Sequence, residues 1–95
     1  MTHQEIAIGN ILSERDRQNE KWGEQNHHPT VWITILMEEV GEAAKEILEG
    51  NSGDALVELV QVGAVTVAMI ESILRNGGWP SATALQLAKK QGKQS

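Results

Sequence analysis

The chain has 95 residues, a mass of 10.4 kDa, a formal net charge of −5 and no cysteine. This length favours a single domain, 1–95, which buries only about 60% of its unfolded surface. Without cysteine, disulfides, thiolate metal sites and a cysteine nucleophile are excluded. Because 13 Asp and Glu outweigh 8 Lys and Arg, no nucleic-acid partner is expected. The first residues lack the pattern of a secretory signal, so we expect a cytoplasmic protein.

The aromatic residues are three tryptophans, Trp22, Trp32 and Trp79, with no Phe or Tyr. The core must therefore be aliphatic and rich in alanine, which suits closely packed helices better than a β-sandwich. With so little bulk per residue, we expect subunits to complete one another's core, as a homodimer or a tetramer.

The N-terminal segment predicts a helix over 3–21. Thr2 and Glu5 have the spacing of a capping box, in which each side chain bonds to the backbone of the other residue. Apolar residues follow at helical spacing, but 14–21 is wholly polar, so we expect the second half to pack lightly. Residues 22–29 then read as a loop.

Pro29 and Thr30 start a second predicted helix. The turn Gly-Asn-Ser-Gly at 50–53 ends it. Between these signals, apolar side chains recur every three or four residues and form a stripe for packing: Ile33, Leu36, Met37, Val40, Ala44, Ile47 and Leu48.

A third predicted helix covers 55–74, with Asp54 as its N-cap. Its β-branched residues leave a buried strand possible over 57–67, but its length and the lack of a second strand favour a helix. A helix that is apolar all round is one buried by other helices. A membrane span is disfavoured because polar residues interrupt the segment: Glu58, Gln61 and Glu71.

We therefore expect an all-α fold. An antiparallel helical hairpin with flanking helices would complete a four-helix bundle by oligomerisation. Beyond the hairpin, residues 79–95 read as a short helix, over 82–90, or as a flexible tail.

Five glutamates crowd one side of the second predicted helix. At 100° per residue they fall within about a quarter-turn of circumference, and like charges four residues apart destabilise a helix. Only Lys45 lies nearby on this helix to offset them. The five are Glu38, Glu39, Glu42, Glu46 and Glu49.

The short turn forces the second and third helices to pack antiparallel. Counting residues from the turn places Glu42 level with Gln61. It places Glu58 one turn away, near Glu46. An ionised carboxylate buried against an apolar helix must be paired, protonated or bound to a cation, and no Lys or Arg lies in 46–74. The pattern therefore predicts a hard divalent ion, Mg²⁺, with oxygen ligands.

The predicted ligands are Glu39, Glu42 and Glu58. Glu58 has no structural reason to interrupt an apolar helix, whereas a glutamate run on a helix face is usually solvated. Glu46 and Glu49 are therefore expected to face water. A di-iron carboxylate site is excluded, because it needs Glu-x-x-His and no histidine stands three residues after a glutamate in these two helices.

Residues 38–42, Glu-Glu-Val-Gly-Glu, are followed after fifteen residues by Glu58. This pattern resembles the EExxE…ExxD signature of the MazG-like nucleoside triphosphate pyrophosphohydrolases. The polar stretch 14–23 is similar to the family's first-helix segment, and the resemblance covers roughly 5–75. It implies an all-α enzyme that hydrolyses a (d)NTP to (d)NMP and pyrophosphate, with Mg²⁺ or Mn²⁺ as cofactor.

The resemblance implies that Glu39, Glu42 and Glu58 bind the metal ion. It gives Glu38 and Glu39 the catalytic role, in which Glu38 binds a second ion or orients the attacking water. Gln61 stands where the signature has Asp. Its amide oxygen can still bind Mg²⁺ but carries no charge, so we expect Gln61 as a weaker metal ligand.

Four residues outside the acidic motif are predicted to bind the nucleotide. Arg15 and Lys21 lie on a polar helix end and would contact the phosphates. Trp22 and Trp32 flank the polar loop and would stack on the base. The two histidines of the loop are expected to face solvent.

Two functions of different classes stay open. The first is the pyrophosphohydrolase, with a (d)NTP as substrate and no membrane partner. The second is a non-catalytic helical module, for assembly or regulation, that retains a weakened nucleotide or metal site. Gln61 in place of the acid is the feature that favours the second.

Overall fold

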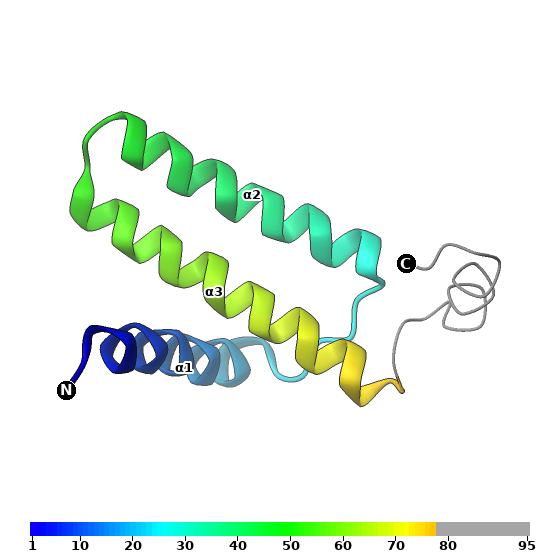
Figure 1. The fold of residues 1–95 in the computed structure, drawn as a ribbon. Coiled ribbons are helices and arrows are strands. Elements are labelled where there is room, and N and C mark those ends of the chain that lie inside the picture. The colour runs from blue at the N-terminus through cyan, green and yellow to red at the C-terminus, as the bar shows by residue number, and fades with distance from the viewer. Residues whose placement is uncertain (78–95) are drawn as a thin grey trace, which may run out of the picture.

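The computed structural model describes residues 1–77, which form three helices: α1 (His3–Trp22), α2 (Pro29–Leu48) and α3 (Ser52–Arg75). α2 and α3 form an antiparallel hairpin, and α1 packs against α3 (Figure 1). The predicted all-α fold is confirmed over these residues, and no strand forms at 57–67. The predicted short helix or tail, 79–95, lies outside the described residues.

The capping box sets the start of α1. The Glu5 N–H donates to Thr2 Oγ1 (3.0 Å), and the Thr2 N–H donates to Glu5 Oε1 (2.7 Å). α1 ends at Trp22, one residue beyond the prediction, because Gly23 takes a φ of 72° that favours glycine. Both ends are therefore set by local sequence.

α2 starts at Pro29 as predicted, with His28 as its N-cap: the Thr30 N–H donates to the imidazole Nδ1 (3.2 Å). The prediction for the start of α3 was wrong. The N-cap is Asn51, and Asp54 lies inside the first turn. There its carboxylate faces the positive end of the helix dipole, which is favourable without any capping bond.

The core of the hairpin is small and forms around Trp32, which is only 2% exposed. Trp32, Val65 and Ala68 are buried together, and Ile35, Leu36 and Met69 pack against them. The predicted alanine-rich core is found in the remaining buried apolar residues of the described chain: Ala43, Ala55 and Ala64.

The predicted apolar stripe of α2 is not the face that α3 covers. The more buried positions of α2 after Trp32 follow a spacing of four and three residues and include two glutamates: Leu36, Glu39, Ala43 and Glu46. Most of the stripe is exposed instead: Ile33, Met37, Val40, Ile47 and Leu48. The stripe lies roughly a quarter-turn round the helix from the α3 contact.

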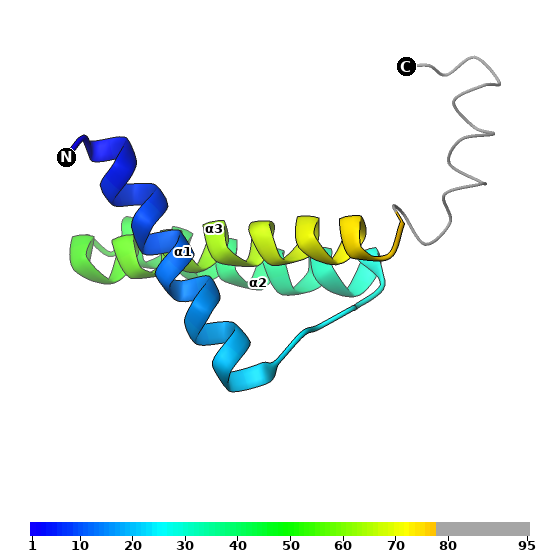
Figure 2. The ribbon, with the colours of Figure 1, turned by 90° about the horizontal axis from the view of Figure 1, so that it is seen from below.

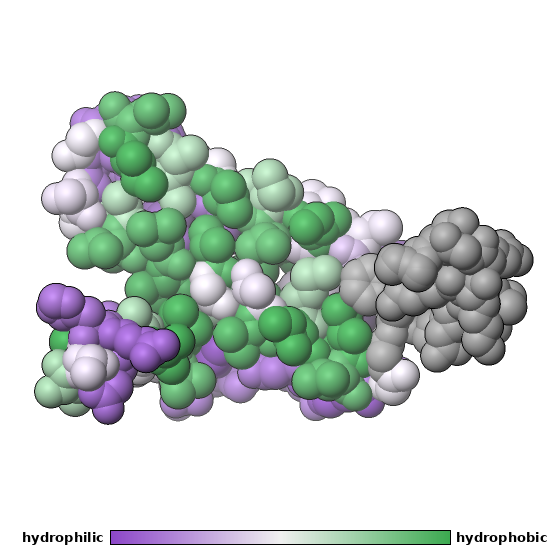
Figure 3. Space-filling model, in the orientation of Figure 1, coloured by the Kyte–Doolittle hydropathy of each residue, from purple (hydrophilic) through white to green (hydrophobic). Residues whose placement is uncertain are grey.

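Within one chain, α3 is not buried on all sides. Its exposed apolar residues are Leu56, Val57, Leu59, Ile70 and Leu74. Figure 3 shows that apolar side chains dominate one face of the hairpin. By length and mean hydropathy, α3 is the one helix within residues 1–77 that could cross a membrane. The core helix of a soluble protein has the same length and hydropathy, so this property does not separate the two.

α1 crosses α3 obliquely and diverges from the hairpin toward its C-terminal end (Figure 2). At the crossing, Gly63 of α3 lies against Ile11 of α1. A Cβ at position 63 would stand 2.6 Å from Ile11 Cδ1 and 2.9 Å from Cγ1. Glycine therefore allows the two helices to approach closely, and this approach places the polar half of α1 beside α3.

Candidate metal centre and adjoining cavity

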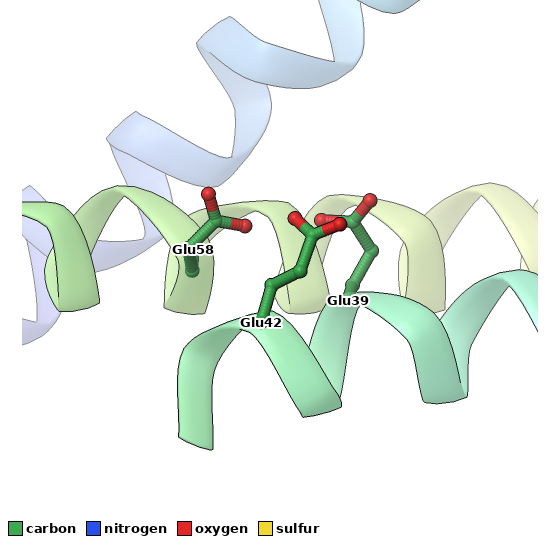
Figure 4. Close-up of side chains that lie close together, drawn as sticks. All are labelled: Glu39, Glu42 and Glu58. Atoms are coloured by element: carbon green, nitrogen blue, oxygen red, sulfur yellow. The ribbon is translucent and has the colours of Figure 1, made fainter. Parts of the chain in front are cut away.

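Three carboxylates converge between the helices of the hairpin. Glu39 and Glu42 project from α2, one turn apart, and Glu58 projects toward them from α3 (Figure 4). One carboxylate oxygen from each lies within 4.8 Å of the others. Two ligands of one Mg²⁺ lie at most about 4.2 Å apart, so small rotamer changes would bring all three oxygens onto one ion.

The environment of this acidic cluster disfavours its charges. Glu39 and Glu58 are half-buried, and Glu58 Oε2 is inaccessible to solvent and has no hydrogen-bond partner. Burial raises the pKa of Glu58, and the nearby Glu42 and Glu39 carboxyls raise it further. Burial and the charge of Glu42 also raise the pKa of Glu39, although a hydrogen bond with Glu58 partly opposes them.

Among residues 1–77, no lysine or arginine forms an ion pair with these three glutamates. A divalent cation would remove the repulsion and supply the unpaired oxygen with a partner. All the donors are carboxylate oxygens, so the set fits a hard ion such as Mg²⁺ or Mn²⁺.

Gln61 stands one turn after Glu58 on α3, beside α1. Its Oε1 accepts a long hydrogen bond from Gln18 Nε2 (3.4 Å). Glu14 of α1 also lies close, since its charge contributes to raising the pKa of Glu39. Hydrogen bonds from Arg17 (2.8 and 2.6 Å) lower the pKa of Glu14 itself. Glu14 was not among the predicted site residues, and only its place in the polar stretch 14–23 could have indicated it.

A cavity of about 360 Å³ adjoins the acidic cluster. All three helices line it, and its volume lies within the range of small-molecule sites. Glu39 and Gln61 stand on the hairpin side. The α1 side carries two cations and an aromatic ring: Arg17, Lys21 and Trp22.

No family model, curated protein or solved structure matches this chain. The assignment of the site therefore depends on its geometry and on the chemistry of its residues.

The structure brings some of the predicted site residues to the cavity and not others. Lys21 and Trp22 line it together, with Lys21 Nζ 4.8 Å from the centre of the Trp22 ring. Trp22 is 58% exposed and free to stack on a ligand. Trp32 also lines the cavity, but it is a core residue. Its ring packs in a T-shaped arrangement with the His27 ring, and the two ring centres lie 4.8 Å apart. These contacts indicate a packing role for Trp32.

Two other predicted residues lie apart from the three converging oxygens. Glu38 is exposed on α2, next to Glu39. Arg15 does not line the cavity: it is 8% exposed and its guanidinium donates to Glu71 on α3. The sequence placed Arg15 correctly on a polar helix, but the pairing with α3 depends on the tertiary structure.

Proposed function

We propose that this protein is a Mg²⁺-dependent nucleoside triphosphate pyrophosphohydrolase that cleaves a (d)NTP to (d)NMP and pyrophosphate. The observation that carries the proposal is the convergence of Glu39, Glu42 and Glu58 beside a cavity of nucleotide size. The resemblance of the sequence to the MazG-like pyrophosphohydrolases points to the same chemistry. A cytoplasmic location agrees with such a substrate.

The arrangement suits a triphosphate for an electrostatic reason. Triphosphate and carboxylates repel each other, so a divalent ion between them is required; when bound, it neutralises phosphate charge and activates water. The hairpin glutamates would hold the ion, with Gln61 as a neutral neighbour. Arg17 and Lys21, across the cavity, would bind the phosphates, and Trp22 would stack on the base.

In the proposed reaction a water attacks the α-phosphorus and the bond to the β-phosphate oxygen breaks. Pyrophosphate leaves, and the proton of the water passes to solvent or to a carboxylate. Glu38 is exposed beside Glu39 and would orient this water.

The test is to incubate purified protein with a panel of NTPs and dNTPs and Mg²⁺ or Mn²⁺, and to measure monophosphate and pyrophosphate. Glu58→Gln should lower turnover by about 100-fold or more, because loss of a residue that merely supports a metal ligand already costs about 10–100-fold and Glu58 is a proposed ligand itself. The same variant should weaken Mn²⁺ binding measured by EPR. Glu49→Gln removes the same charge from the exposed end of α2 and should change neither. Orthophosphate as the first product, or no turnover of any nucleotide, would contradict the proposal.

A second candidate function is a non-catalytic helical module. The hydrogen bond from Gln18 to Gln61 favours it, because it engages the amide oxygen that would otherwise face a metal ion. Gln61→Asp separates the two candidates. A rise from no turnover to clear turnover would show that the natural protein is a degraded relative of an enzyme, whereas an active wild type excludes the module.

We also propose that the protein is a homodimer, or a tetramer of two dimers, in which two hairpins form a four-helix bundle. The support is the uncovered apolar face of the hairpin (Figure 3). A second copy would cover the exposed apolar residues of α3, so no membrane is needed to do so.

A further inference from the structure

The cationic wall of the cavity belongs to a helix with few apolar contacts. α1 packs against α3 and not against α2. Ile11 is half-buried over Gly63, but its apolar neighbours Ile8 and Leu12 are about half exposed. Hydrophobic burial therefore holds α1 only at the crossing, and other contacts must fix the direction of its polar half.

Arg15 supplies such a contact. Its Nη2 and Nε donate to the two carboxylate oxygens of Glu71, at 2.5 and 3.4 Å. Its remaining donors bond to Gln18 (3.0 Å) and Asn19 (3.1 Å) on its own helix. The Arg15 side chain is 10% exposed and that of Glu71 40% exposed, so water screens this pair less than a surface pair.

The pair lies at one end of the cavity wall. Gln61, Val65 and Ala68 line the cavity from α3, and Glu71 follows at the same helical spacing. On α1, Arg15 precedes Arg17 and Lys21, which line the opposite wall. A shift of α1 at Arg15 would therefore move both cations relative to the carboxylates.

We propose that Arg15 is a positioning residue: its ion pair with Glu71 holds α1 so that Arg17 and Lys21 face the acidic cluster across the cavity. Arg15 then acts through these two cations and does not touch the phosphates. This role rests on the proposed function, because it concerns the same cavity.

The experiment is a double-mutant cycle with Arg15→Met, Glu71→Met and the double variant. Positioning predicts that each single variant raises KM by about 10-fold, with kcat changed less than about 3-fold, since phosphate binding is lost equally in ground and transition states. The double variant should resemble the single ones and not multiply their effects. Mn²⁺ affinity measured by EPR should stay that of the wild type, because the three carboxylates are intact.

A second readout does not need turnover. Inorganic tripolyphosphate, with Mn²⁺, carries the charge of every triphosphate and no base, so its Kd by calorimetry reports on the cationic wall. Both single variants should raise this Kd by about as much as KM. Circular dichroism checks that they remain folded, and Lys45→Met, which removes one positive charge from the exposed side of α2, should leave both constants unchanged.

The outcomes separate three cases. An effect of Arg15→Met without one of Glu71→Met means that Arg15 touches the phosphates directly, which overturns positioning. Wild-type constants in both single variants also overturn it, and leave the ion pair with a role in stability alone. Wild-type protein that neither binds tripolyphosphate nor turns over nucleotide contradicts the proposed function itself, and the positioning role with it.

Discussion

At the scale of single residues, the acidic cluster brings together groups that are unfavourable in a folded protein. Glu58 lies in a largely apolar stretch of α3, near two carboxylates of α2. Its Oε2 has neither solvent nor a hydrogen-bond partner, and such groups are costly in a folded protein. A cation bound by the three carboxylates, as proposed above, would offset this cost.

The raised pKa of Glu58 and Glu39 predicts how metal-free protein responds to pH. Both values lie above the ordinary 4.5. Above pH 4.5 the native state therefore binds more protons than the unfolded state, and the free energy of unfolding falls as pH rises through the raised values. Glu5 and Glu14 have lowered pKa values, so the stability that they contribute is lost only as pH falls below 4.5.

Urea unfolding with EDTA, at pH values from about 4.5 to 7.5, measures this dependence. With Glu58→Gln, the free energy of unfolding should fall less steeply as pH rises through this range, because the variant removes one of the two glutamates whose pKa is raised. It should leave the loss of stability in acid unchanged. Equal slopes for wild type and variant above pH 4.5 would show that the cluster is better solvated than the structure indicates.

At the scale of elements, a close apolar approach and an ion pair hold α1 on α3, beside the long hydrogen bond from Gln18 to Gln61. Gly63 makes the approach possible, since a Cβ there would collide with Ile11. The ion pair of Arg15 and Glu71 fixes the direction of the helix beyond the crossing. Both contacts link α1 to α3, so the cavity between them depends on how well α1 is docked.

Gly63→Ala should destabilise the protein by about 1 kcal/mol. Overpacking costs about 1–3 kcal/mol, and the better helix propensity of alanine returns about 0.5–1 kcal/mol. Ile11→Ala should lower the free energy of unfolding less in the Gly63→Ala background than in the wild type, because it removes the side chain with which the new Cβ collides. Urea unfolding measures all four proteins. Gly9→Ala, where a Cβ meets nothing within 4 Å, is the control and should be neutral or stabilising.

If the effects of Gly63→Ala and Ile11→Ala simply add, the two residues are not in contact as described. In that case the α1–α3 crossing must differ from the one in Figure 2. The cavity wall would then need another explanation.

At the scale of the whole molecule, one chain leaves too much apolar surface in water. Met37 on α2 is 57% exposed and Ile70 on α3 is 51% exposed. Apolar side chains also dominate one face of the hairpin (Figure 3). Contiguous apolar surface of this kind usually marks an interface. In the proposed dimer, the exposed stripe of α2 is the part of the core that a second subunit would complete.

Met37→Glu should turn a dimer into a monomer, because it puts a charge into the apolar interface. The fold of one chain should persist, since Met37 is exposed there. Sedimentation velocity measures the mass, and circular dichroism the helix content. Val31→Glu is a matched control, because Val31 is 44% exposed but lies nine residues before Val40, on the opposite side of α2.

A wild-type chain that sediments as a monomer would contradict the dimer. So would a Met37→Glu variant that keeps the mass of the wild type. Neither result would affect the acidic cluster, whose three residues all belong to one chain.

The helices were predictable because their signals are local. Thr2 and Glu5 cap α1, and Pro29 opens α2, so these ends fall within one residue of the prediction. The start of α3 was predicted wrongly: Asp54 is a favourable N-cap residue, but the helix begins at Ser52, with Asn51 as its N-cap. Counting from the short turn predicted that the glutamates of the two helices lie near one another. It placed Glu58 near Glu46, whereas in the structure the Glu58 carboxylate lies beside those of Glu42 and Glu39.

The sequence alone therefore determined the helices and the hairpin, because each follows from residues near one another or from counting along a helix. Only the tertiary structure decided which side of α2 meets α3, that Arg15 pairs with Glu71, and that Glu14 lies near the cluster. These three depend on the angle at which helices cross. Helical periodicity gives the faces of each helix, but it does not say which face meets which neighbour.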